Sequence, residues 1–210
     1  MKLPAPPLLF ITDRRQARRG LEDTVAAALD GGVRWVSLRE KDLSFAERAR
    51  LLTKLVERSR TYAATVTVHE DIDAALEAGA DGVHLPSRGD PAAARRRLGA
   101  SALIGVSTHS AETAAAAADT GADYVTISPI FMSASKPGYG PVLGLPALAS
   151  IAQRVRVPVI ALGGIDATTA GDCLAAGAAG IAAMGGLMTA NDPAAATRAL
   201  LEAMATRPAG

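Results

Sequence analysis

A single (β/α)8 barrel is the fold class that the sequence predicts, and three observations lead to it. Strand-like and helix-like segments alternate eight times along the 210 residues, which is typical of a parallel sheet whose strands are joined by helices. A glycine-led phrase recurs where a helix gives way to a strand, at residues 79–83, 121–125 and 177–181. The even spacing, with no G-x-G-x-x-G after the first strand, favours the barrel over its rival, a doubly wound open sheet. We expect one domain over residues 1–210.

The first half of the chain alternates short apolar runs with amphipathic stretches. An apolar run that ends in polar residues predicts the first strand, and the helix after it ends at the glycine pair Gly31-Gly32. A capping box, Ser44 with Glu47 three residues later, opens the second helix. The expected strands are residues 8–13, 33–39, 65–68 and 82–85, and the expected helices are residues 21–29, 44–60, 72–78 and 91–98.

The second half repeats the pattern on both sides of a long irregular loop. Short apolar runs again predict the strands, and alanine-rich stretches predict the helices between them. Asp192 at the cap and Pro193 in the first turn predict the start of the last helix. The expected strands are residues 103–107, 124–127, 157–162 and 180–184, and the other expected helices are residues 111–118, 145–155 and 168–176.

The irregular loop lies within residues 127–145, ISPIFMSASKPGYGPVLGL. Its density of proline and glycine forbids a helix and a central strand alike. Loops of this length are uncommon in compact domains and often form lids or binding loops. The middle carries Ser133, Ser135 and Lys136, whose hydroxyls and ammonium suit a phosphate or pyrophosphate. The alternative is a solvated polar loop without a ligand.

Composition and charge exclude several classes of protein. The net charge is +1 and aromatic residues make up 3% of the chain, so no nucleic-acid surface and no attraction to an anionic membrane is indicated. The single cysteine, Cys173, excludes an internal disulfide and a cysteine metal cluster. No apolar run reaches the roughly 18 residues of a membrane span, and the N-terminus does not read as a signal peptide. We expect a cytoplasmic protein with a small-molecule ligand, and a homodimer is compatible with the sequence.

Barrel enzymes carry their active sites at the C-terminal ends of the strands. Alternation along the second strand places Ser37, Arg39 and Lys41 on one face. Polar residues also follow the other strands. Those after the first, third, fourth and fifth strands are Thr12, Asp13, His69, Glu70, Asp71, Ser87, Arg88, Ser107, Thr108 and His109.

Glycine pairs follow the last two expected strands, Gly163-Gly164 and Gly185-Gly186. These positions match the phosphate site of many barrels, where the amides of loops and helix N-termini hold the anion. We expect glycine there because the backbone must come close to the phosphate oxygens. With Arg39, Lys41 and Lys136 nearby, the pattern predicts a phosphorylated small molecule that carries a second anionic group.

Segments in this order resemble the thiamine phosphate synthase/TenI family: SLREKD at 37–42, GADGVHL at 79–85, IGVSTHS at 104–110, SASKPG at 133–138 and ALGGI at 161–165. The resemblance runs from about Leu8 to the last helix. It implies a (β/α)8 barrel and an enzyme of thiamine biosynthesis that binds a phosphorylated thiazole. Synthases of this family join a pyrimidine diphosphate to a thiazole phosphate and release pyrophosphate, using Mg²⁺. TenI-type members instead catalyse a tautomerisation that makes the thiazole ring aromatic, without a metal.

The chain departs from the synthase pattern where that pattern binds Mg²⁺. His69-Glu70 stands in place of Asn-Asp, and Gly89 stands in place of the second acidic residue, with Arg88 beside it and Asp90 one position late. Mg²⁺ requires near-ideal octahedral oxygen ligation, and a nearby guanidinium opposes it. We therefore expect no metal cofactor, or Mg²⁺ held through Glu70, with Asp90 as a substitute ligand, if the chain is a synthase.

These departures favour a TenI-type thiazole tautomerase. The resemblance places its catalytic histidine at His109, and a neutral imidazole near pH 7 can remove or deliver a proton. Glu70 is the next acid/base candidate, and His84 is expected to be a structural residue of the fourth strand. Groups that a synthase would use on the pyrophosphate and substrate side are nevertheless present, namely Ser37, Arg39, Lys41, His69, Ser107, Ser133, Ser135 and Lys136.

Three alternatives to the tautomerase stay open. The first is the Mg²⁺-dependent synthase. The second is a non-catalytic sensor of a phosphate ligand, which the altered metal positions would permit. The third is a different barrel isomerase of the phosphosugar type, with Glu70 or Asp13 as its base.

Overall fold

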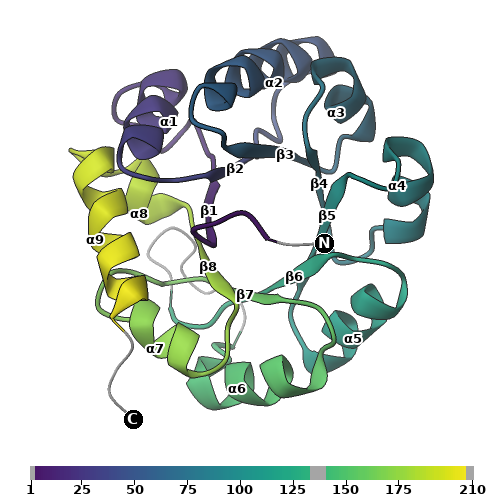
Figure 1. Ribbon diagram of the computed structural model, residues 1–210, viewed down its shortest axis with the longest axis vertical. Coiled ribbons are helices and arrows are strands. Elements are labelled where there is room, and N and C mark those ends of the chain that lie inside the picture. Colours follow the sequence, from purple (N-terminus) through teal and green to yellow (C-terminus); the bar gives the residue numbers. More distant parts are fainter. Residues whose placement is uncertain (1–2, 133–140, 207–210) are drawn as a thin grey trace.

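The computed structural model describes residues 3–132 and 141–206, and within them eight parallel strands close into a barrel in sequence order (Figure 1). β1 pairs with β8 to close the ring. The predicted (β/α)8 barrel is confirmed, and the open sheet is excluded because a closed ring has no edge strand. The strands are β1 (Leu8–Ile11), β2 (Trp35–Leu38), β3 (Thr65–His69), β4 (Gly82–Leu85), β5 (Leu103–Thr108), β6 (Tyr124–Ile127), β7 (Val159–Leu162) and β8 (Gly180–Ala183).

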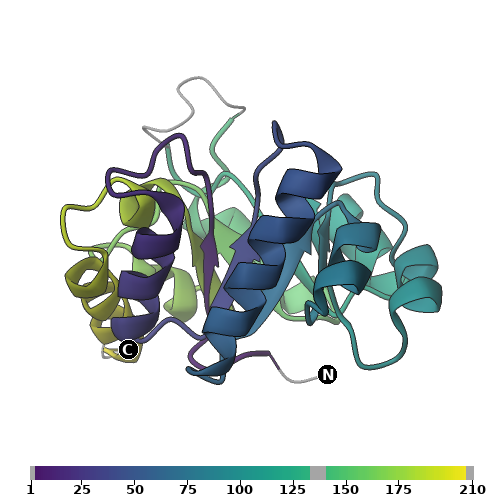
Figure 2. The same cartoon turned by 90° about the horizontal axis from the view of Figure 1, so that it is seen from above.

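A helix follows each strand and returns the chain along the outside of the barrel (Figure 2). The helices are α1 (Leu21–Asp30), α2 (Phe45–Arg60), α3 (Ile72–Ala78), α4 (Pro91–Leu98), α5 (Ala111–Asp119), α6 (Gly144–Arg154), α7 (Ala170–Ala175), α8 (Gly185–Met188) and α9 (Pro193–Ala205). The sequence did not predict α8, because a helix of 4 residues leaves no periodic pattern. α7 begins later than predicted, because the Asp166 carboxylate accepts hydrogen bonds from Thr168 and holds a turn there. In the described residues, no helix is long and apolar enough to cross a membrane.

Polar caps fix the points at which the strand-end loops enter the helices. The predicted capping box of α2 is present, and Asp192 caps α9 as predicted. Asp71 caps α3 and Asp90 caps α4, and each carboxylate accepts a backbone N–H of its helix at 2.9 Å. Both carboxylates therefore serve to start helices beside the ends of β3 and β4.

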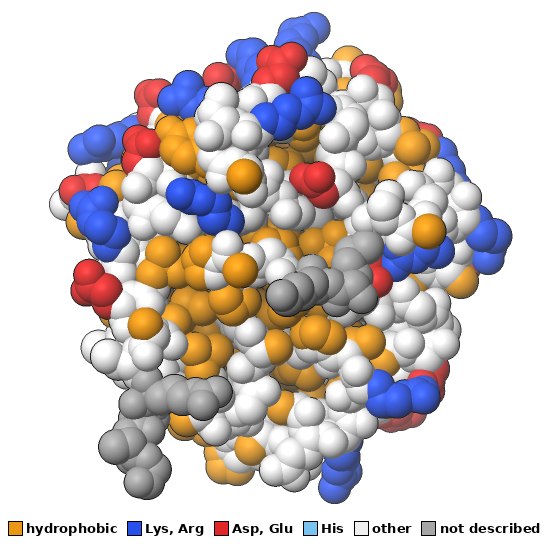
Figure 3. Space-filling model, in the orientation of Figure 1, with side chains coloured by type: hydrophobic (Ala, Val, Ile, Leu, Met, Phe, Trp, Pro, Cys, Tyr) orange, Lys and Arg blue, Asp and Glu red, His pale blue; other side chains and the backbone are white. Residues whose placement is uncertain are grey.

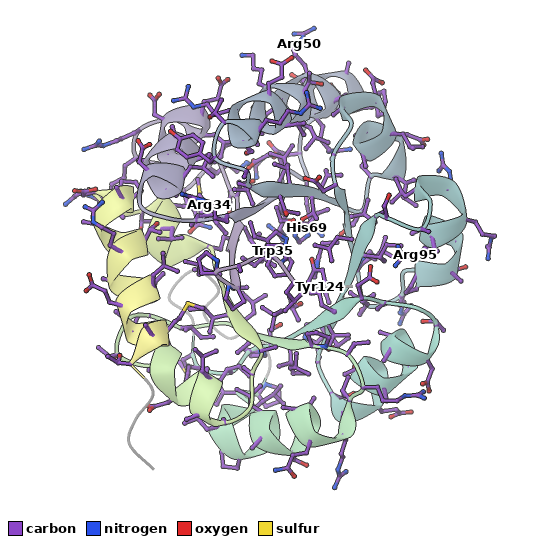
Figure 4. The ribbon with its side chains drawn as sticks, in the orientation of Figure 1. Arg34, Trp35, Arg50, His69, Arg95 and Tyr124 are labelled. Atoms are coloured by element: carbon purple, nitrogen blue, oxygen red, sulfur yellow. The ribbon has the colours of Figure 1, made fainter. Side chains whose placement is uncertain are left out.

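Side chains along each strand alternate between the helices and the barrel axis. Outward residues such as Phe10 and Val36 are buried beneath the helices. Inward residues form a second apolar cluster, which consists of Leu9, Ile11, Trp35, Leu103, Tyr124, Ile160 and Ala182. Trp35 and Tyr124 meet edge to face with ring centroids 4.7 Å apart, and Figure 4 shows both near the barrel axis. Aromatic packing thus fills the barrel near the N-terminal ends of the strands.

The face at those N-terminal ends is the one seen in Figures 1 and 3. Apolar side chains gather at its centre, and charged side chains lie around the rim over the helices (Figure 3). Leu3 packs against the inward cluster on this side. The barrel is filled here, so a ligand has to approach from the opposite end.

Glu40 joins the loop after β1 to the loop after β2. Its buried carboxylate accepts a hydrogen bond from the Thr12 hydroxyl at 2.8 Å and from the Arg14 backbone N–H at 3.0 and 3.1 Å. The Thr12 oxygen in turn accepts the backbone N–H of Arg39 at 2.9 Å. Burial raises the pKa of Glu40, and the hydrogen bonds from Thr12 and Arg14 offset this only in part.

Replacing Glu40 by Gln should change how stability depends on pH. A raised folded-state pKa means that the stability contributed by this group is present below the ordinary glutamate pKa of about 4.3 and is lost as pH rises through the folded-state value. Gln does not titrate. The unfolding free energy of Glu40→Gln relative to that of the wild type should therefore increase from about pH 4 to about pH 7, as measured by urea unfolding. Glu57→Gln on α2 is the matched control, and a difference that stays constant or shifts toward the wild type would contradict this account.

Candidate active site

A cavity of about 830 Å³ opens at the C-terminal ends of the strands, the end that barrel enzymes use for catalysis. The ends of all eight strands contribute to its wall. Its volume lies in the upper part of the range of small-molecule sites. Of the residues predicted for the site, the structure brings together Arg39, Lys41, His69, Glu70, Ser107, His109, Gly163, Gly164, Gly185 and Gly186.

Some predicted site residues are not part of this wall. Ser37 is fully buried inside the barrel, one residue before the end of β2, and it is not part of the cavity wall. Ser133, Ser135 and Lys136 lie outside the described residues. Asp13 turns toward its own loop, where it accepts a hydrogen bond from Gln16 at 2.6 Å.

The cationic side of the cavity lies just past the end of β2. Arg39 and Lys41 both line it. The Arg39 backbone N–H donates a hydrogen bond to the Thr12 hydroxyl oxygen, which fixes the backbone at Arg39. Within the described part of the chain, the Arg39 guanidinium has no carboxylate partner at ion-pair distance. An uncompensated guanidinium in a cavity wall favours an anionic ligand.

Lys41 already has a partner, Glu70. The ammonium lies 2.8 Å from the carboxylate, and both side chains are about half exposed. Glu70 has a φ of 66°, the left-handed region that a glutamate rarely adopts, and its N–H donates to the His84 carbonyl at 3.0 Å. Exposed ion pairs contribute little free energy, so separating Lys41 from Glu70 has a small cost.

A second part of the cavity wall, here called the amide side, is formed by the loops after β7 and β8, and in the first of them Gly163 and Gly164 have φ of 101° and 66°. A Cβ on Gly164 would lie 2.3 Å from the Met132 carbonyl oxygen, and the Gly163 carbonyl accepts the N–H of Phe131 at 2.9 Å. Close packing against the loop after β6 therefore requires these glycines. The structure thus gives a packing reason for these glycines, and the close approach of a phosphate stays a prediction.

Several backbone amides on this side lack a backbone partner in the part of the chain that the structure describes. The backbone N–H groups of Gly163, Gly164, Gly185 and Gly186 have no backbone acceptor among the described residues. A Cβ on Gly186 would meet no atom within 4 Å, so this residue borders open space. Unpaired N–H groups at the ends of barrel strands are a usual place for a phosphate.

His109 lies between the cavity and the loop after β6. Its Nδ1 is 2.8 Å from the Ser128 carbonyl oxygen. A carbonyl can only accept, so a neutral His109 carries its proton on Nδ1, and Nε2 is the basic nitrogen. The loop contact orients the ring, and the ring still lines the cavity.

His84 is a residue whose place in the site the sequence did not predict. It is buried, its nitrogens bond to Tyr124 and Ser107, and it also lines the cavity. Burial, with the charge of Arg39 as a smaller cause, lowers the pKa of His84 to about 3, so the ring stays neutral. The alternation of side chains along β4 could have predicted it, because the residues on either side of His84 are apolar and face the helices.

An apolar wall completes the cavity and was also not predicted. It comes from several strand ends and from the loop after β6, and includes Ile11, Pro129, Phe131, Leu162, Ile165, Ala182 and Met184. Such a surface suits a flat heterocyclic ring, while the polar sides bind charged groups.

The Mg²⁺ that the resemblance implies for a synthase does not fit the residues present. Glu70 is paired with Lys41, and Asp71 caps α3 and is also paired with Arg48. Asp90 caps α4 and does not line the cavity. A side chain at Gly89 would place its Cβ 2.6 Å from the Leu85 Cβ. Among the residues that the structure describes, no three His, Cys, Asp or Glu side chains form a metal site.

The family model described as thiamine monophosphate synthase matches residues 8–187. The chain is 42% identical to the thiamine-phosphate synthase of Roseiflexus sp. (strain RS-1) over 192 residues, which cover 90% of this chain and 81% of the relative. It is 41% identical to the thiamine-phosphate synthase of Roseiflexus castenholzii over 199 residues, which cover 94% of this chain and 87% of the relative. A thiamine phosphate pyrophosphorylase from Pyrococcus furiosus has a similar structure, with a TM-score of 0.84, 32% identity and coverage of 94% of this chain and 95% of that one.

These similarities do not confirm the TenI-type tautomerase that the sequence departures favoured. They fit the synthase alternative better, because the relatives carry the synthase name. The fold, the order of the motifs and the extent of the family match agree. The chain belongs to the thiamine monophosphate synthase family of enzymes.

Proposed function

We propose that this chain is a thiamine-phosphate synthase, which joins hydroxymethylpyrimidine diphosphate to thiazole phosphate and releases pyrophosphate. The observation that carries the proposal is that one cavity has two separate sides suited to anions. Arg39 and Lys41 form one side, and the amides after β7 and β8 form the other. Coupling two phosphorylated substrates needs two such sides, whereas isomerising one phosphorylated ring needs only one.

The chemistry assigns a task to each side. The bond between the pyrimidine methylene carbon and the diphosphate oxygen breaks, and its electron pair leaves with pyrophosphate. The thiazole nitrogen then forms a bond to that carbon with its lone pair. Arg39, together with Lys41 released from Glu70, stabilises the charge that develops on the leaving group. The amides after β7 and β8 hold the thiazole phosphate, so that its ring nitrogen faces the carbon.

Arg39→Gln tests the division of labour between the two sides. Loss of a charged hydrogen-bond donor should lower kcat/KM for the pyrimidine diphosphate by about 10- to 100-fold. The affinity for thiazole phosphate should stay within about two-fold, because its phosphate binds to amides on other strands. Steady-state production of thiamine phosphate and pyrophosphate measures the first quantity, and calorimetry measures the second.

Arg50→Gln is the matched control, since Arg50 is on α2 and points away from the barrel (Figure 4). Equal losses toward both substrates in Arg39→Gln would contradict the two-sided site. A wild-type protein that makes no thiamine phosphate but binds both ligands would instead be a sensor of phosphate ligands.

The residues at the Mg²⁺ positions of the family, Glu70 and Gly89, give a prediction that does not depend on turnover. Free Mg²⁺ titrated into the protein without substrate should show no saturable binding in the millimolar range, because Glu70 alone offers too few oxygen ligands. Gly89→Asp should not create a site, since the added Cβ would meet Leu85. Calorimetric binding of Mg²⁺ that disappears in Glu70→Gln would show that a metal site exists.

A thiazole tautomerase remains a second candidate function because of one observation, the orientation of His109. The ring lines the cavity with its Nδ1–H donated to Ser128, which leaves Nε2 as the basic nitrogen. An aromatising tautomerisation removes a proton from carbon and delivers one elsewhere on the ring. One imidazole can carry out both transfers.

His109→Asn separates the two functions. If the protein is a tautomerase, the variant should keep its fold and its affinity for thiazole phosphate but slow tautomerisation by at least about 100-fold. Ring aromatisation followed by ultraviolet absorbance measures the rate. Unchanged turnover would remove His109 from the mechanism, and Glu70 would be the next residue to test.

A further inference from the structure

A chain of hydrogen bonds runs from the interior of the barrel to the cavity. The Tyr124 hydroxyl lies 3.0 Å from His84 Nδ1, and His84 Nε2 lies 2.9 Å from the Ser107 hydroxyl. Tyr124 is fully buried, His84 is 1% exposed, and Ser107 reaches the cavity wall. Three groups from neighbouring strands therefore link the apolar interior to the cavity.

The chemistry of the three groups decides which of them donates in each hydrogen bond. Burial raises the pKa of Tyr124, so the phenol keeps its proton and needs an acceptor inside the barrel. Among the described residues, the Nδ1 of His84 at 3.0 Å is that acceptor, since the nearby Thr67 hydroxyl meets no hydrogen-bond geometry. A neutral His84 then has its proton on Nε2 and donates it to the Ser107 oxygen, and the hydrogen of Ser107 is left to point toward the cavity. The reverse direction would take the Ser107 hydrogen away from the cavity.

The surrounding residues hold the Tyr124 phenol in the position that this series of hydrogen bonds requires. A Cβ on Gly105, the facing residue of β5, would lie 2.0 Å from the Tyr124 ring, so the strand gives up a side chain to admit it. Trp35 also packs against the ring, edge to face. The Thr126 hydroxyl is 3.5 Å from His84 Nε2, at the limit of a hydrogen bond, so Ser107 is the closer partner.

We infer that Tyr124 and His84 are positioning residues that hold Ser107 as a hydrogen-bond donor to substrate, and that His84 and His109 present opposite ring nitrogens as hydrogen-bond donors. His84 carries its proton on Nε2 and His109 carries its proton on Nδ1. The ligand atom that faces Ser107 is an acceptor, such as a ring nitrogen or a phosphate oxygen. The role of Ser107 toward substrate rests on the proposed function, whereas the tautomers of the two histidines do not depend on it.

Nitrogen NMR of the imidazole rings tests the tautomers directly. The chain has three histidines, so ¹⁵N-histidine spectra are simple, and a His→Asn variant at each position assigns them. We expect protonated Nε2 for His84 and protonated Nδ1 for His109. Tyr124→Phe keeps the ring but removes the donor, so the Nδ1–H population of His84 should rise while His109 stays unchanged. Tyr62→Phe, which deletes an exposed hydroxyl bonded to Asp30, should change neither.

A double-mutant cycle tests whether Tyr124 acts through Ser107. Tyr124→Phe and Ser107→Ala should each weaken binding of thiazole phosphate or of pyrimidine diphosphate by about two- to ten-fold, and the double variant should lose no more than Ser107→Ala alone. Additive losses, or a wild-type His84 protonated on Nδ1, would overturn the inference. Absence of binding of both compounds to the wild type would refute the proposed function, and the NMR result would still decide the tautomers.

Discussion

The alternation of side chains along strands that close into a ring sets what the rest of the molecule can do. Each outward residue is buried under a helix, and each inward residue faces the axis. Apolar and aromatic side chains fill the axis near the N-terminal ends, and His84 and Ser107 follow further along. Beyond them the inward positions become the cavity wall, so Arg39 and His109 are continuations of strand faces. The barrel strands therefore set the positions of the site residues, and few additional contacts are needed to hold them.

Positive charge in the site comes from side chains and amides, and the nearby carboxylates have other tasks. Glu40 is used to join two loops, Asp71 and Asp90 start helices, and Glu70 neutralises Lys41. A metal ion would have to compete for groups that are already engaged, which costs free energy. Within the described residues, Arg39 has no carboxylate at ion-pair distance and the amides after β7 and β8 have no backbone acceptor, so an anionic ligand would meet them without that competition.

The sequence alone predicts much of this arrangement. Alternating apolar runs predict the barrel, and motif order places Arg39, His109 and the glycine pairs at strand ends, where the structure has them. Two features escaped prediction for physical reasons. The glycines after β7 are required by contact with the loop after β6, a segment distant in sequence. The place of His84 depends on which strand face is inward, and a strand of 4 residues gives a weak signal of that.

The measurement that tests the central claim most directly is a crystal structure with pyrophosphate and thiazole phosphate both present. If the cavity has two sides suited to anions, pyrophosphate should contact the side chains of Arg39 and Lys41, with Lys41 turned away from Glu70. The thiazole phosphate should accept hydrogen bonds from the amides of Gly163-Gly164 and Gly185-Gly186. Both anions on the same side, or amides turned away from an empty loop, would contradict the account.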